Sequence, residues 1–132
     1  MTVVKVDLLQ LDGRTEVMVS DVAISGAIKQ GDIWWIPQGQ PFKLTGNAQL
    51  PDGQMMVMVE RVVDADKPID DVRFIATIQD GQLTLTGVFE KSGNYVISAE
   101  RLNRGLERIG MPIKLVFDTV EFDAFVPVDI QS

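Results

Sequence analysis

Two adjacent tryptophans, Trp34 and Trp35, are the residues best suited to binding a partner. They lie between Asp32 and Pro37 in a short apolar stretch. Because successive side chains of a strand point to opposite faces, one indole is expected to enter the core and the other to lie at the surface. An exposed indole is a good anchor for a protein partner or a sugar ring. The alternative is that both are covered, one by the core and one by an N-terminal hairpin.

An acidic cluster around Pro68 is the second set of residues that could carry chemistry. It consists of Asp64, Asp66, Asp70 and Asp71. Carboxylates on a flexible loop are the hard oxygen ligands that calcium takes. However, the spacing matches no EF-hand loop, and no glycine stands at the sharp turn of such a loop. A solvated acidic loop is therefore the favoured interpretation, and a calcium site is the alternative.

Three arginines, Arg101, Arg104 and Arg108, follow one another at helical spacing. Glu100 and Glu107 lie among them and offset their charge. Spacings of three and four residues place such side chains near one another on a helix, so a solvated helix face is the favoured interpretation. The alternative is a docking surface for an acidic neighbour, which could be another copy of this chain.

The composition excludes most catalytic classes. The chain contains no histidine and no cysteine. No Ser-His-Asp or Cys-His nucleophile and no ordinary zinc site can therefore be built from it. No phosphate-binding glycine loop or nucleophile elbow is present either. A paired-carboxylate glycosidase is the catalytic class left open, and the prediction is a non-enzymatic protein without a cofactor.

The charge balance and the N-terminus limit the partners and the location. The 132 residues include 12 basic and 19 acidic side chains, which gives a net charge of −7. Such a chain is repelled by phosphate backbones and anionic lipids, so neither nucleic acid nor membrane partners are expected. Lys5 and Asp7 interrupt the N-terminal apolar residues, which predicts cytoplasmic synthesis without an export signal. A virion is one destination compatible with this expectation.

The residue types and turn signals predict strands. Valine and isoleucine outnumber leucine and alanine, and β-branched side chains favour pleated surfaces. Asp-Gly occurs at residues 12–13, 52–53 and 80–81, and this dipeptide suits the positive-φ positions of tight hairpin turns. Three antiparallel hairpins are therefore predicted, which pair residues 3–9 with 15–24, 41–50 with 55–63, and 72–78 with 83–89.

The C-terminal third combines a helix with a long final strand. Leu102, Leu106 and Ile109 share a helical face, which predicts a short helix near residues 100–109. Along residues 113–126, the alternating apolar residues that would face the core shift by one position near Asp118, which predicts a bulge there. The whole chain is expected to form one all-β domain, an antiparallel two-layer β-sandwich, with residues 1–36 as an N-terminal hairpin plus an extra strand and 41–126 as the core.

Several segments of the core share their order with a known kind of module. They are Phe42-Lys43-Leu44-Thr45-Gly46, Leu50-Pro51-Asp52-Gly53, the strand to Val63, Asp80-Gly81-Gln82-Leu83-Thr84-Leu85 and Gly93-Asn94-Tyr95-Val96-Ile97. Residues 41–126 thereby resemble the immunoglobulin-like modules of bacterial surface proteins and tailed-phage virions, with Tyr95 similar to a tyrosine corner. The sequence departs from that pattern in lacking a tryptophan on the third strand and in the predicted helix of its last connection.

The resemblance implies adhesion, spacing or assembly rather than catalysis. We therefore predict a structural protein, specifically a small virion component such as a tail, connector or capsid-decoration protein, with protein partners that include further copies of itself. The unpaired edges of segments 3–9 and 113–126 are expected to make the contacts. The alternative is a ligand-binding module for carbohydrate at the tryptophans or calcium at the acidic cluster.

Overall fold

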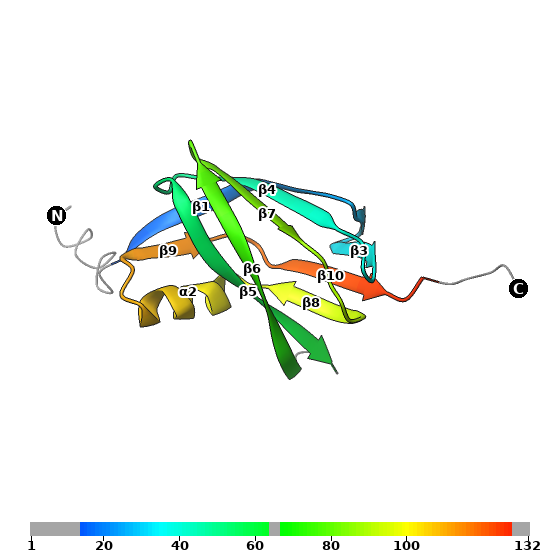
Figure 1. Cartoon of the computed structure of the whole chain (residues 1–132). Coiled ribbons are helices and arrows are strands. Elements are labelled where there is room, and N and C mark those ends of the chain that lie inside the picture. The colour runs from blue at the N-terminus through cyan, green and yellow to red at the C-terminus, as the bar shows by residue number, and fades with distance from the viewer. Residues whose placement is uncertain (1–13, 64–66, 128–132) are drawn as a thin grey trace, which may run out of the picture.

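A computed structural model describes residues 14–63 and 67–127 of the chain. These residues form ten strands and one helix (Figure 1). The elements are β1 (Thr15–Ser25), β2 (Ile28–Gln30), β3 (Ile33–Pro37), β4 (Phe42–Ala48), β5 (Gly53–Val63), β6 (Lys67–Gln79), β7 (Gln82–Gly87), β8 (Gly93–Ile97), α2 (Ala99–Arg108), β9 (Ile113–Val116) and β10 (Val120–Phe125). The prediction of an all-β protein with one short helix is confirmed.

The strands form one curled sheet in the order β2-β3-β10-β8-β5-β6-β7-β4-β1-β9. β9 and β10 lie far apart in this order, although only residues 117–119 separate them along the chain. Three extended residues span about 10 Å at most, so the sheet must curl until its two flanks face each other. The core lies between these flanks, and α2 lies beside β9 and β5 (Figure 1).

The sheet is mixed rather than antiparallel, which corrects the predicted antiparallel two-layer sandwich. β1 runs parallel to β9, and β3 runs parallel to β10. Both parallel pairs join the N-terminal part of the chain to its C-terminal part, such as Thr15 to Ile113 and Ile33 to Glu121. Turn signals report only local pairing, because parallel strands are joined by long crossovers and not by turns.

The three predicted hairpins have different outcomes. The third is confirmed at its turn, where Asp80 and Gly81 adopt positive φ angles of 52° and 76°, but β6 pairs with β7 only over 76–79. The second is wrong, since β4 pairs with β1 and β7 while β5 pairs with β6 and β8. Asp52 does not adopt the positive φ that a type I′ turn requires. The first predicted hairpin includes segment 3–9, which lies outside the described residues.

The helix follows the predicted pattern except at Ile109, which is its C-cap residue with a φ of −93° and is 71% exposed. Ser98 caps its N-terminus, where the hydroxyl oxygen accepts a 3.2 Å hydrogen bond from the backbone N–H of Arg101. Leu102 and Leu106 are buried, and Gly110 has the left-handed φ of 77° that commonly ends a helix. The predicted bulge in the final strand is instead a complete break, since residues 117–119 separate β9 from β10.

Aromatic side chains fill the centre of the core. Phe89 stacks on Phe42 and on Tyr95 with ring-centre distances of 5.0 and 4.1 Å, and Phe122 packs against the same ring. The buried Tyr95 hydroxyl donates a 2.6 Å hydrogen bond to the carbonyl of Lys91. Burial raises the pKa of this phenol above its ordinary value. The hydroxyl is therefore a neutral, satisfied group that ties the 88–92 connection to β8.

Candidate functional site

The two tryptophans lie on opposite faces of β3, as the alternation of a strand requires. Trp34 pairs with the buried Phe122 and packs against the core. Trp35 pairs with Asp123 on the outer face. The prediction that one indole points into the core and the other outward therefore holds in direction, although both indoles are half-buried. The difference between them is which face each indole covers.

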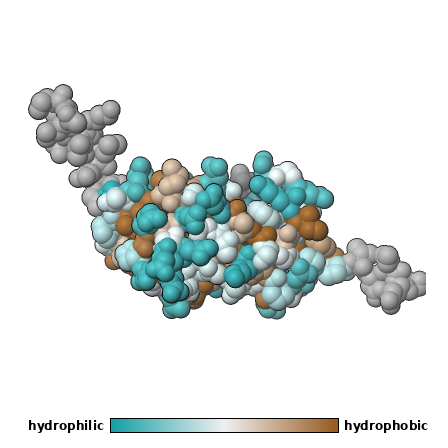
Figure 2. All heavy atoms as spheres, turned by 90° about the horizontal axis from the view of Figure 1, so that it is seen from above, coloured by the Kyte–Doolittle hydropathy of each residue, from teal (hydrophilic) through white to brown (hydrophobic). Residues whose placement is uncertain are grey.

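The outer face around Trp35 carries an exposed apolar surface. We call it the Trp35 surface, and it consists of Ile28, Trp35, Pro37, Phe125 and Val126. Ile28 is 67% exposed and Val126 is 61% exposed. A groove of about 380 Å³ runs between the first four of these side chains. Figure 2 shows hydrophobic side chains at the surface beside the C-terminal end of the described chain.

The Trp35 surface adjoins an open strand edge. β2 stands at one end of the sheet order, and within the described part of the chain it pairs only with β3. Its other side therefore presents backbone groups without a strand partner. An open ladder beside apolar side chains offers both main-chain hydrogen bonds and desolvation to a protein partner.

Local backbone features hold this surface in place. Gly26 has a φ of 93°, and a Cβ there would lie 2.6 Å from the carbonyl oxygen of Pro41, so only glycine fits the turn from β1 to β2. The side-chain amide of Gln40 donates to the carbonyl of Gly26. The backbone N–H of Gln38 donates a 2.7 Å bond to the carbonyl of Phe125, which joins the end of β3 to the end of β10.

A carboxylate borders the Trp35 surface on β10. Asp123 lies beside Trp35 in register, and burial followed by the neighbouring Glu121 carboxylate raises its pKa above the ordinary value. Asn94 donates a 2.9 Å hydrogen bond to Glu121. The surface thus has an apolar centre with polar groups at its margin, as protein interfaces commonly do.

A second groove, of about 690 Å³, lies on the other side of β3. Trp34 forms part of its wall, and the Lys29 ammonium lies 5.6 Å from the centre of that indole. Four carboxylates from three segments of the chain line it: Asp21, Asp32, Asp118 and Glu121. No sequence pattern indicates that these four meet, because β1, the β2–β3 turn and the β9–β10 connection come together only in the folded sheet.

The three predicted arginines do not form one exposed face. Arg101 is only 17% exposed and lies 3.8 Å from Glu60 and 3.6 Å from Asp71. Arg104 pairs with Glu100 at 3.1 Å, one turn earlier in the helix. Arg108 is exposed at the end of α2. The prediction of a common arginine face is therefore wrong for Arg101, which joins α2 to β5 and β6.

The two described members of the acidic cluster, Asp70 and Asp71, lie beside cations. Asp70 and Asp71 lie on β6, so the predicted loop ends before them. Asp70 lies 3.5 Å from Arg61 and 3.7 Å from Lys91, whereas Asp71 pairs with Arg101. Asp64 and Asp66 lie outside the described residues. Across 14–63 and 67–127, no group of three or more acidic side chains is placed to hold a metal ion.

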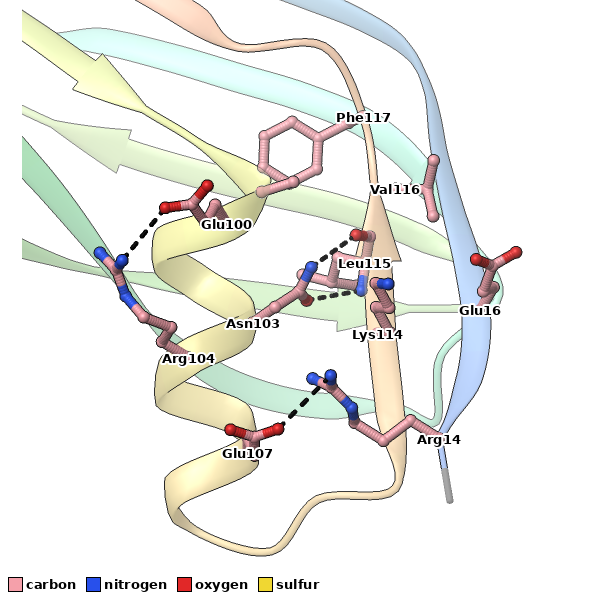
Figure 3. A pocket seen from close by; sticks show the side chains of 11 residues that line it. Arg14, Glu16, Glu100, Asn103, Arg104, Glu107, Lys114, Leu115, Val116 and Phe117 are labelled. Atoms are coloured by element: carbon pink, nitrogen blue, oxygen red, sulfur yellow. Dashed lines mark hydrogen bonds and ion pairs between the residues drawn. The ribbon is translucent and has the colours of Figure 1, made fainter. Parts of the chain in front are cut away.

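The outer edge of β9 is closed by a buried amide. Asn103 on α2 donates a 2.9 Å bond to the carbonyl of Leu115 and accepts a 2.7 Å bond from its N–H (Figure 3). One side chain thus makes the two hydrogen bonds that a neighbouring strand would make. Since β10 also has strands on both sides, the expected open edge along 113–126 is wrong.

The groove beside this amide, of about 520 Å³ between α2, β9 and β1, has balanced charges. Arg14 lies 3.5 Å from Glu107, and Arg104 pairs with Glu100 across the helix surface (Figure 3). Because the charges of these ion pairs offset one another, the groove favours neither an anionic nor a cationic ligand.

The sequence signal for Asn103 was a polar residue on the apolar helix face, between Leu102 and Leu106.

No protein-family model, curated protein or solved structure matches the chain. In the described residues, no helix has the length and hydropathy needed to cross a membrane.

Proposed function

We propose that this chain is a non-enzymatic structural protein that joins a larger assembly through the Trp35 surface. The observation that carries the proposal is the apolar cluster of exposed Ile28 and Phe125 with half-buried Trp35, beside the open edge of β2. Large aromatic side chains in such clusters provide most of the binding free energy of protein interfaces. The open edge adds main-chain hydrogen bonds that do not depend on the sequence of the partner.

The specific form of the proposal is a small virion component, such as a tail, connector or capsid-decoration protein. It rests on the resemblance of residues 41–126 to immunoglobulin-like modules. The hydrogen bond from the Tyr95 hydroxyl to Lys91 supports that relationship, because a tyrosine corner also binds the backbone a few residues upstream. The mixed strand order is a departure from the usual sandwich.

The test is incorporation of the chain into particles in its source cell. Tagged wild-type chain should sediment with a large particle at a fixed copy number, measured by quantitative mass spectrometry. Trp35→Ser should remain in the free fraction, because the indole anchor is lost. Met18→Ser is the matched control, since Met18 is 65% exposed on β1 and lies away from the Trp35 surface. A wild-type chain found only in the free fraction would contradict the proposal.

The second candidate function is carbohydrate binding in the groove at Trp34. The specific observation is an indole in one wall with four carboxylates around it. Carboxylates accept hydrogen bonds from sugar hydroxyls, and an indole offers a flat apolar face. Binding on a glycan array that is lost in Asp118→Asn, with folding unchanged, would support this candidate. If the chain binds no glycan on the array, carbohydrate binding is excluded for the glycans tested.

A further inference from the structure

β6 has a long open edge that the Trp35 surface does not include. The strand pairs with β5 from Lys67 to Ile78, but it pairs with β7 only from Ala76 to Gln79. Among the described residues, no strand lies against 67–74 on the β7 side. In Figure 1, β6 and β7 diverge below their shared turn.

The packing of Phe74 explains why the two strands separate. A Cβ on Gly87 would lie 2.7 Å from the Phe74 ring, so this ring covers the end of β7. The ring packs edge-on against Phe42 and Phe89, both at 5.7 Å. β7 therefore turns away toward β4 while β6 continues, and the open edge lies on the N-terminal side of Ile75.

The turn between β6 and β7 determines which backbone groups face this edge. A two-residue turn makes Gln79 and Gln82 a hydrogen-bonded pair, and the pattern alternates along an antiparallel strand. The N–H and C=O groups of Arg73 and Asp71 consequently face the open side. Pro68 does not interrupt this series, because it lies beyond the register shift at the far end of β6.

The exposed side chains along the edge are self-complementary. Asp71 and Arg73 flank Val72, and Ile69 and Ile75 lie further out, 48% and 50% exposed. In an antiparallel pair of β6 strands centred on Val72, each Asp71 lies opposite Arg73 of the other copy. Each Ile75 likewise approaches Ile69 of the other copy. If the pairing were centred on residue 71, Asp71 would lie opposite Asp71 of the other copy. If it were centred on residue 73, Arg73 would lie opposite Arg73.

The charges available at the edge also suit this arrangement. Arg73 has no ion-pair partner within the described residues, so it is free to meet a carboxylate. Asp71 already lies 3.6 Å from Arg101, and the incoming arginine would add a second cation to it. Opposite charges on facing residues stabilise an antiparallel pair, and like charges destabilise it.

We propose that β6 pairs antiparallel with β6 of a second copy of this chain, with Val72 on the two-fold axis. Two observations support this register. The backbone groups of Asp71 and Arg73 both face the open side, so the two residues can form a hydrogen-bonded pair across the interface, and their side chains carry opposite charges. The dimer goes beyond the proposed function and does not rest on it, because β10, β8 and β5 separate β3 from β6 in the sheet.

Charge exchange tests the register directly. The full chain is studied by sedimentation and native mass spectrometry over a range of concentrations. Arg73→Asp alone places a carboxylate opposite each Asp71, so its dimer dissociation constant should rise about tenfold or more. Asp71→Arg alone should do the same by opposing guanidinium groups. The double variant Asp71→Arg/Arg73→Asp restores opposite charges and should dimerise again. An equimolar mixture of the two single variants should form mixed dimers.

The controls separate folding and the other surface from this interface. Arg73→Lys keeps the charge and should stay dimeric, and Trp35→Ser should stay dimeric because it lies on another surface. If Asp71→Arg does not fold, Arg73→Asp against Arg73→Lys still tests the claim. A wild-type chain that is monomeric at all concentrations would overturn the proposal, and so would an Arg73→Asp variant that dimerises as wild type does.

Discussion

A single buried amide replaces a missing strand at the edge of this sheet. Asn103 is the polar residue among the buried side chains of the described core, and its amide nitrogen and oxygen both bind Leu115. Without it, one N–H and one C=O of β9 would be buried without partners. Unsatisfied buried polar groups cost about 1–3 kcal/mol each, which is more than a satisfied pair contributes.

Asn103→Ala should therefore lower the free energy of unfolding by about 2–4 kcal/mol, because two backbone groups lose their partners. Chemical denaturation measures this change. Arg104→Ala, at the exposed neighbouring position, is the control and should change stability by less than about 0.5 kcal/mol. Equal stability of the two variants would contradict the role given to the amide.

The two tryptophans should respond differently to truncation. Trp34 packs against the core, so Trp34→Ala should cost about 2–4 kcal/mol, somewhat less than a fully buried aromatic. Trp35 covers the outer face, so Trp35→Ser should cost less than half as much. Thermal and chemical unfolding of the two purified variants give this comparison. A larger loss for Trp35 than for Trp34 would show that the faces are assigned the wrong way round.

Asp123 provides a pH-dependent test. Burial and then Glu121 raise its pKa, so the folded chain binds this proton more tightly than the unfolded chain does. Its contribution to stability is present below the ordinary aspartate pKa and is lost as the pH rises through the folded-state pKa. Asp123→Asn cannot ionise and should be more stable than wild type at neutral pH, with the difference shrinking in acid. A less stable variant at neutral pH would contradict this.

At the scale of elements, two glycines in different surroundings form a matched pair. Gly87→Ala should destabilise the protein by about 1–3 kcal/mol, because its Cβ would meet the Phe74 ring at 2.7 Å. Gly105→Ala in α2 should stabilise it by about 0.5–1 kcal/mol, since among the described residues nothing beyond its chain neighbours and the local helix backbone lies within 4 Å of that Cβ. Thermal unfolding measures both, and a stabilising Gly87→Ala would contradict the packing of Phe74 on β7.

Elements with local causes were predictable from the sequence. Asp80 and Gly81 supply the positive φ angles of the β6–β7 turn, and the spacing of Leu102 and Leu106 placed α2 within one residue. Pairings between strands that are distant in the sequence were not predictable. The β4 strand could pair with β5 or with β7, and only the packing of the whole core selects β7.

At the scale of the whole molecule, the site could be predicted only in part. The outward position of one tryptophan follows from alternation, but Ile28 and Phe125 join Trp35 only because β3 runs parallel to β10 and antiparallel to β2. The open edge of β6 could not be predicted, because it results from the Phe74 ring against Gly87. Two separate surfaces, one self-complementary and one apolar, would allow dimers to attach to a larger assembly.

Hydroxyl-radical footprinting of the chain, free and within particles from its source, reports directly on whether the Trp35 surface is buried in an assembly. We predict that Ile28, Trp35 and Phe125 are oxidised in the free chain and protected in the particle. Met18, which is 65% exposed on β1, should be oxidised equally in both. Equal oxidation of Trp35 in the free and particle-bound chain would contradict attachment through this surface.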